Sequence, residues 1–174
     1  RVKNNIDPKK TAQHLELNHQ GVTRSGGPLF WSHYSFLGLD PRRLRDRYAD
    51  YWRHNVEHTR INRQHCIENP MGYRGYGPQC WGLTAGYSVG FYAAHRPGED
   101  LGVISPTAAL SSFPYTPRES LRALRHFHDD LGHWIYGPYG FYDGFSLHLG
   151  GKRQLTDKMK LLLGTLFYWT PVPK

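Results

Sequence analysis

The sequence predicts a mainly helical protein, in which helical hairpins are joined by long loops rich in aromatic residues. Apolar residues recur at three- and four-residue steps in several segments, and capping residues and prolines stand where those segments would begin. Alternation of apolar and polar residues, which would indicate strands, is weak except briefly over residues 101–104. Long helices joined in this way pair as antiparallel hairpins, and their loops build a site at one end of the bundle.

The first half of the chain predicts one long helix after a polar lead-in over residues 1–24. Ser32 is expected to cap a short helix that Gly38 closes. The long helix is expected to follow Asp40, a good N-cap, with Pro41 at the first helical position and an end before Pro70. Its apolar stripe, expected to face the core, consists of Leu44, Tyr48, Tyr51, Trp52, Val56 and Thr59.

The second half predicts a long loop followed by shorter helices. Residues 70–105 are rich in Gly, Tyr and Pro, and a loop of this length in a compact domain is usually functional. Ser105 and Pro106 open a short helix, and Thr116 and Pro117 open a longer one with a capping box. A final helix is expected over residues 155–169, inside a divergent tail that covers residues 147–174.

Composition excludes several classes of protein. Of the 174 residues, 14% are aromatic and 39% are hydrophobic, so the chain can build a core and is not intrinsically disordered. Since no run of about 18 apolar residues occurs, no membrane span is expected. The two cysteines, Cys66 and Cys80, cannot form a disulfide scaffold; they are small core residues or, in an oxidising compartment, a single disulfide.

The net charge of +8 admits nucleic acid, anionic membranes or acidic glycans as partners. The densest basic stretch, residues 41–47, carries four arginines and is interrupted by Asp46. Helical geometry would spread these arginines around the axis, so a solvated helix face is the favoured interpretation. We therefore expect no nucleic-acid partner.

One short pattern matches a metal-binding motif. His54, Glu57 and His58 form an inverted zincin pattern, H-x-x-E-H, which places two imidazoles on one helix face. A third ligand on another helix is not evident, so we expect no zinc. The chain contains no phosphate-binding loop, no G-x-G-x-x-G and no G-x-S-x-G, and no cofactor is expected.

Four acids stand among aromatic residues, a setting that suits a sugar site: Glu68, Glu99, Asp100 and Asp143. Glycoside hydrolysis uses a pair of carboxylates, and flat rings stack on pyranose faces. Glu68 and Asp143 are the candidates, although each alone is also explained as a residue that satisfies a turn. Trp81, beside Gly82, is either a stacking platform or a lid over the core.

Together, these segments resemble the glycoamylase-like family, which includes bacterial endo-β-1,2-glucanases and the glucoamylase-like domains of cyclic β-1,2-glucan synthases. The resemblance covers about residues 25–146. The matching stretches are residues 26–30 (Gly-Gly-Pro-Leu-Phe), 33–41 (His-Tyr-Ser-Phe-Leu-Gly-Leu-Asp-Pro), 50–52 (Asp-Tyr-Trp), 66–70 (Cys-Ile-Glu-Asn-Pro), 81–85 (Trp-Gly-Leu-Thr-Ala), 105–117 (Ser-Pro-Thr-Ala-Ala-Leu-Ser-Ser-Phe-Pro-Tyr-Thr-Pro) and 139–143 (Tyr-Gly-Phe-Tyr-Asp).

The resemblance implies part of an (α/α)6 toroid, with a cleft built by loops at one end. It implies an inverting glycoside hydrolase that acts on a β-glucan, with β-1,2-glucan oligosaccharides or polysaccharides expected. Trp81 and Thr84 would line the cleft, Tyr115 and His33 would contact the substrate, and Asp143 lies on a loop that approaches it. A periplasmic or secreted location is expected. The chain opens without Met or an apolar stretch, so it contains no secretory signal and is expected to be a mature or truncated chain.

The chain also departs from the family pattern. Gly86 and Tyr87 stand where the family has Ser-Asp, and residues 147–174 contain neither the Asp-Gln-Gly-Pro nor the Glu-Asn-Tyr-Arg motif. The acidic helix expected upstream is absent from residues 1–24. Two hypotheses remain: a catalytically incomplete part of a hydrolase, or a non-catalytic glycan-binding module.

Overall fold

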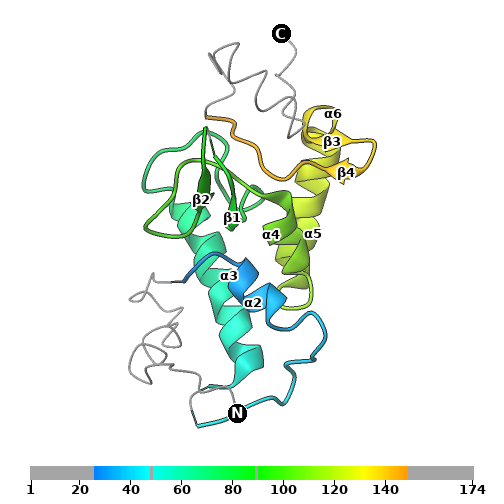
Figure 1. The fold of residues 1–174 in the computed structure, drawn as a ribbon. Coiled ribbons are helices and arrows are strands. Elements are labelled where there is room, and N and C mark those ends of the chain that lie inside the picture. Colours follow the sequence, from blue (N-terminus) through cyan, green and yellow to red (C-terminus); the bar gives the residue numbers. More distant parts are fainter. Residues whose placement is uncertain (1–25, 48, 89, 149–174) are drawn as a thin grey trace.

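The computed structural model describes residues 26–47, 49–88 and 90–148 (Figure 1). Helices dominate this part of the chain, which confirms the mainly helical prediction. The lead-in over residues 1–24 and the helix predicted over residues 155–169 lie outside the described residues. The elements are α2 (Phe30–Tyr34), α3 (Tyr51–Glu68), β1 (Ala85–Tyr87), β2 (Tyr92–Ala94), α4 (Pro106–Ser111), α5 (Pro117–Arg125), a π-helical turn η1 (His126–Asp130), α6 (Gly132–Ile135), β3 (Tyr136–Gly137) and β4 (Gly140–Phe141).

The long helix begins ten residues later than predicted. Its N-cap is Asp50, whose Oδ1 accepts a hydrogen bond of 3.0 Å from the backbone N–H of Arg53. Asp40 instead accepts from the N–H of Arg42 in a turn. Arg43 has a left-handed φ of 66°, which a helix cannot contain, so the chain cannot be helical from Pro41 onward. The predicted start was therefore wrong.

The buried face of α3 is polar rather than aromatic. Tyr51, Trp52 and Val56 are only half-buried, so the predicted stripe does not form the core. The buried residues of the helix are Asn55, His58, Thr59, Ile61, Asn62, His65 and Cys66. Some of these side chains hold neighbouring loops in place; Asn62, for example, accepts from the N–H of Leu83 and donates to its C=O.

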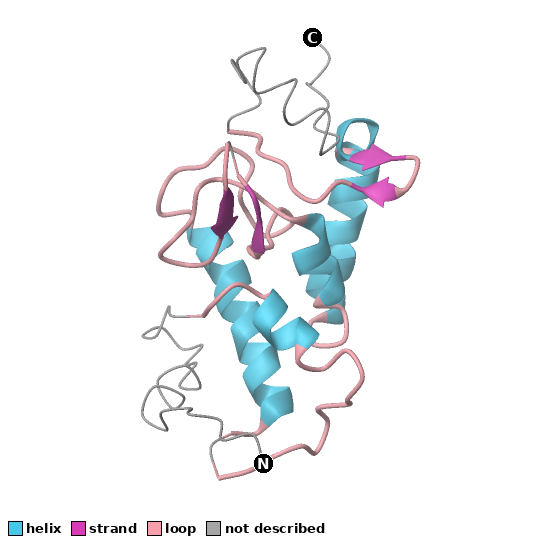
Figure 2. Cartoon of the chain, viewed as in Figure 1, coloured by secondary structure: helices cyan, strands magenta, loops and turns pink. Residues whose placement is uncertain are grey.

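The core lies between α3 and the pair α4–α5, which pack side by side (Figures 1 and 2). The predicted starts of α4 and α5 are confirmed, with Ser105 and Thr116 as N-caps and proline at the first turn of each. The predicted capping box is not formed, because Thr116 Oγ1 donates to the carbonyl oxygen of Ser112 and makes no capping hydrogen bond. The fully buried members of this core include Leu29, Cys66, Trp81, Leu83, Ala109, Ala123 and Phe127.

The loop over residues 70–105 contains a hairpin that the sequence did not reveal. Strands β1 and β2 pair antiparallel, with Gly86 opposite Ala93. The strands have three residues each, too few to produce a recognisable alternation. Farther along, Ile104 exchanges two backbone hydrogen bonds of 2.8 Å with Phe145, which fixes the loop that carries Asp143.

Candidate functional site

A line of polar side chains runs along α4 and joins several predicted site residues. Ser105 Oγ donates to the carbonyl oxygen of Asp143 at 2.5 Å and lies 3.1 Å from Thr107 Oγ1. Ser111 Oγ donates to the carbonyl of Thr107 at 2.5 Å and lies 2.8 Å from His33 Nδ1. We call Ser105, Thr107 and Ser111 the α4 strip. Asp143 lies at one end of it and His33 at the other.

At the His33 end, two predicted contacts come together. His33 and Tyr115 stack with their rings 6.2 Å apart and nearly parallel, at 5°. The Tyr115 hydroxyl accepts a hydrogen bond of 3.1 Å from Asn55 Nδ2, and its ring lies 5.2 Å from that of Trp52. The stacked pair therefore packs on α3 through the contacts of Tyr115 with Asn55 and Trp52.

Thr84 lies between β1 and α2. Its Oγ1 accepts from the backbone N–H of Phe30 at 3.1 Å, and the neighbouring Leu83 carbonyl accepts from Leu29 at the same distance. Thr84 thus holds the first turn of α2, the helix that carries His33. Accepting this bond gives the Thr84 side chain a structural role in the described part of the chain.

Asp143 lies over the β1–β2 hairpin. A Cβ added to Gly86 would come within 3.2 Å of Asp143 Oδ2, so the carboxylate occupies the space that a larger residue at position 86 would fill. Asp143 is exposed, and its main chain is held by Ser105. An accessible carboxylate on a main chain held at the end of the α4 strip is able to accept hydrogen bonds from hydroxyl groups or to move a proton.

The two remaining predicted residues do not join the strip. Trp81 has an exposed fraction of 0%, and the adjacent Gly82 packs directly under α4, so the indole offers no face for stacking. The structure therefore favours the alternative that Trp81 covers the core. Glu68 is exposed at the C-terminal end of α3, where its Oε1 accepts from Gln64 Nε2 at 3.3 Å.

The zincin-like pattern is used for packing. Both ring nitrogens of His58 are engaged: Nδ1 lies 2.6 Å from Ser32 Oγ and Nε2 lies 2.7 Å from the Gly27 carbonyl oxygen. Within the described ranges, no group of three or more His, Cys, Asp or Glu residues is arranged to hold a metal ion. His58 therefore anchors the segment before α2 rather than a cation.

Neither cysteine is suited to nucleophilic catalysis. Cys66 and Cys80 are buried as free thiols, so the disulfide alternative is not realised. Burial raises the pKa of Cys80 to about 12 and raises that of Cys66 as well. Since the thiolate is the reactive form, both side chains act as small core residues.

Two histidines near α2 are held neutral. Burial lowers the pKa of His33 from 6.5 to about 4, with a smaller contribution from His58. Burial likewise lowers the pKa of His58 to about 4; its hydrogen bond to Gly27 opposes this effect, and His54 adds to it. The unfolded chain therefore binds protons at these positions at a higher pH than the folded chain does.

This difference predicts acid sensitivity. The stabilisation that comes from neutral His33 and His58 is fully present above pH 6.5 and is lost as the pH falls toward 4, at about 3 kcal/mol for each histidine. The free energy of unfolding, measured in urea between pH 4 and 8, should therefore rise with pH. His58→Gln should flatten this rise and His133→Gln, an exposed control, should not. Equal slopes in all three proteins would contradict the assignment.

The α4 strip is the part of the site that sequence reasoning missed. Thr107 and Ser111 are four residues apart, a spacing that puts them on one helix face, and this was the available signal.

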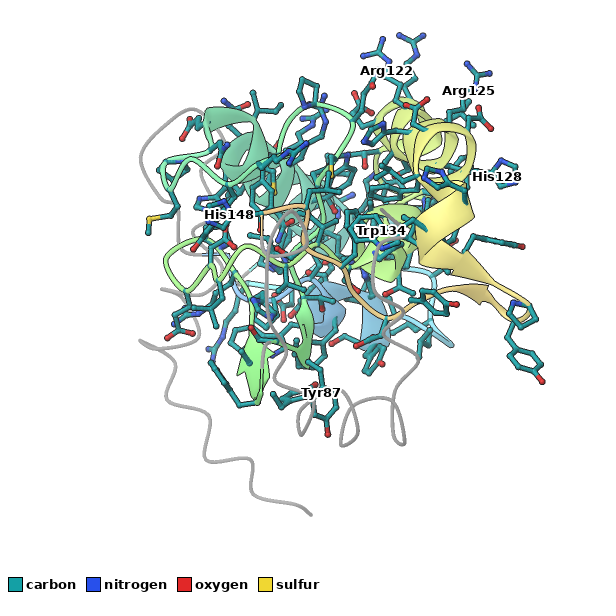
Figure 3. All side chains as sticks on the ribbon, turned by 90° about the horizontal axis from the view of Figure 1, so that it is seen from above. Tyr87, Arg122, Arg125, His128, Trp134 and His148 are labelled. Atoms are coloured by element: carbon teal, nitrogen blue, oxygen red, sulfur yellow. The ribbon has the colours of Figure 1, made fainter. Side chains whose placement is uncertain are left out.

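The basic face of α5 is not part of the site. Arg122 and Arg125 point outward from α5, whereas Tyr87 lies with the hairpin on the opposite side of the molecule (Figure 3).

The chain belongs to the Glycoamylase family, described as "Putative glucoamylase", which matches residues 3–163. It is 49% identical over 125 residues to an exo β-1,2-glucooligosaccharide sophorohydrolase (non-reducing end) from Parabacteroides distasonis. It is also similar to two solved structures. One is an endo-β-1,2-glucanase from Chitinophaga pinensis in complex with sophorotriose and glucose (64% identity, TM-score 0.69), and the other is a β-1,2-glucanase from Parabacteroides distasonis (48% identity, TM-score 0.70).

These similarities confirm the family resemblance and cover only part of each relative. The matched region is 71% of this chain but 17% of the sophorohydrolase. For the two glucanase structures, the match covers 71% and 74% of this chain and 30% and 18% of theirs. The chain thus spans less than a third of the relatives with which it is compared.

Proposed function

We propose that this chain forms part of the substrate cleft of a glycoside hydrolase that acts on β-1,2-glucan. The observation that carries the proposal is the 64% identity to a β-1,2-glucanase whose structure was solved with sophorotriose and glucose. Under this proposal, the described helices are a section of an (α/α)6 toroid, and the protein acts in the periplasm or outside the cell.

The α4 strip has the chemistry that a glucan needs. Thr107 and Ser111 are exposed hydroxyl residues that can exchange hydrogen bonds with sugar hydroxyls, and Asp143 supplies an accepting carboxylate. On the neighbouring α2, Trp31 and Tyr34 are 45% and 68% exposed and offer rings for stacking on pyranose faces. Polar groups that fix orientation beside flat apolar surfaces are typical of a sugar site.

Cleavage with inversion requires a second acid opposite Asp143, about 6.5–9.5 Å away. Glu68, the other predicted acid, lies at the end of α3, outside the α4 strip. Stacking and hydroxyl contacts bind the ground state and the transition state about equally, so they provide affinity without rate. We therefore expect this chain to bind β-1,2-glucan oligosaccharides weakly and to hydrolyse them little.

The test is calorimetric titration of the 174-residue chain with β-1,2-gluco-oligosaccharides, with β-1,3-gluco-oligosaccharides as a linkage control. We expect Asp143→Asn or Ser111→Ala to weaken binding of the β-1,2 series by about tenfold, the effect of one lost hydrogen bond to a charged or well-oriented group. Asp129→Asn, an exposed control on η1, should bind as the parent does. Absence of binding by the parent would overturn the proposal for this chain.

A second candidate is a non-catalytic glycan-binding module, favoured because, of the two predicted acids, the described residues bring only Asp143 to the α4 strip. An assay for released reducing ends separates the two. Ready hydrolysis that disappears in Asp143→Asn would establish an enzyme with its acids in place. Binding without hydrolysis, even when the remainder of a relative's domain is supplied, would establish the module.

A further inference from the structure

The β1–β2 hairpin brings a buried histidine to the same face as Asp143. Gly86 and Ala93 are paired across the two strands, and their positions share one face because side chains alternate along a strand. His95, two residues after Ala93, continues that face, while the Asp143 carboxylate covers it at Gly86. The small residues at positions 86 and 93 leave room for both polar groups.

His95 is enclosed but has no hydrogen bond. Its exposed fraction is 1%, and neither Nδ1 nor Nε2 has a partner among the described residues. A neutral imidazole has one donor and one acceptor, and leaving either buried without a partner costs about 1–3 kcal/mol. A polar group kept at such a cost indicates a partner that the static contacts do not include.

Two carboxylates act on His95, and Asp143 has more accepting capacity left than Asp100. Asp100 already accepts from Tyr76 and the N–H of Gly102 through Oδ1 and pairs with His65 through Oδ2. The carboxylate oxygens of Asp143 accept no hydrogen bond from the described residues, while its main chain is fixed by Ser105. Asp143 is therefore the partner that His95 has available.

We propose that His95 is a positioning residue for Asp143: its ring N–H is donated to a bridging water that in turn donates to the Asp143 carboxylate, and so holds that carboxylate over Gly86 at the end of the α4 strip. The proposal rests on the proposed function only where Asp143 is taken to contact a glucan. The coupling between the two side chains is a property of the protein without ligand.

The charges around His95 make this coupling measurable. Burial lowers the pKa of His95, and the negative charges of Asp100 and Asp143 oppose that effect. Removing the Asp143 charge should therefore lower the pKa of His95 further. Asp100 also acts on the ring through its charge, and it is unchanged in that variant, so the change reports Asp143 alone.

The first experiment follows the ring nitrogens of His95 by 15N NMR in the 174-residue chain between pH 4 and 9. We expect the pKa of His95 to fall by about half a unit or more in Asp143→Asn, in keeping with an opposite charge a few ångströms away. Asp129→Asn, which removes the partner of His128, should leave His95 unchanged. The same titration of His95 in Asp143→Asn and in the parent would overturn the proposal.

The second experiment measures positioning through affinity for β-1,2-gluco-oligosaccharides. His95→Phe removes the donor and should weaken binding by about tenfold, whereas His95→Gln keeps an N–H donor and should retain most of it. In the Asp143→Asn background, His95→Phe should have no further effect. Additive losses, in variants whose circular dichroism is that of the parent, would show that His95 does not act through Asp143.

Failure of the proposed function and failure of the positioning role of His95 give different results in these two experiments. If no variant and not even the parent binds a glucan, the proposed function fails, and the NMR titration still decides whether His95 and Asp143 are coupled. If the parent binds a glucan but the pKa of His95 is the same in Asp143→Asn as in the parent, the proposed glucan site stands and the positioning role is wrong.

Discussion

Trp81→Ala is expected to lower the free energy of unfolding by about 3–5 kcal/mol, a large fraction of the stability of an ordinary domain. The side chain is 0% exposed and is the largest in the core cluster, where it lies among residues from α3, α4 and α5. Its removal leaves a cavity that backbone as tight as that around Gly82 cannot close. Chemical denaturation monitored by circular dichroism measures the loss.

Matched variants separate a core role from a sugar-binding role. Trp81→Phe should cost less, because the indole Nε1 has no hydrogen-bond partner among the described residues and only volume is lost. Trp31→Ala, on the 45% exposed indole of α2, should leave stability nearly unchanged and weaken glucan binding. A Trp81→Ala protein of parental stability with impaired glucan binding would show that the tryptophan reaches the substrate after all.

Asp100→Ala is expected to have an effect of similar size, about 3–5 kcal/mol, because it removes one partner from a buried polar network. The Asp100 side chain is 3% exposed and lies 2.9 Å from His65 Nε2, while its Oδ1 accepts from the Tyr76 hydroxyl at 2.8 Å. The alanine variant leaves those groups buried without a partner. The loop over residues 70–105 should then detach from the end of α3.

Two comparisons test this explanation. Tyr76→Phe removes one donor and leaves the rest of the network intact, so it should cost only about 1 kcal/mol. Asp130→Ala breaks an exposed pair with His126 and should cost at most about 1 kcal/mol. In Asp100→Ala, the amides of residues 70–105 should exchange with solvent hydrogen faster than those of α5. If Asp100→Ala were as stable as Asp130→Ala, Asp100 would not be what holds the loop.

Several features of the site were predictable because their signals are local. Proline after Ser105 and after Thr116 marked the starts of α4 and α5, since proline is favoured at the first helical turn. The motifs that carry the family resemblance also placed His33, Tyr115 and Asp143 in one functional set. The structure joins these three through the α4 strip and the His33–Tyr115 stack.

The sequence by itself determined the helical class, the starts of α4 and α5 and the family, because each rests on residues close together or on ordered motifs. Tertiary structure alone decided the start of α3, its polar buried face and the burial of Trp81. These depend on partners far apart in the chain: Asn62 binds Leu83 and His65 binds Asp100, across 21 and 35 residues. A hydrogen bond or a packing contact across such a separation leaves no periodicity in the sequence, so only the folded chain reveals it.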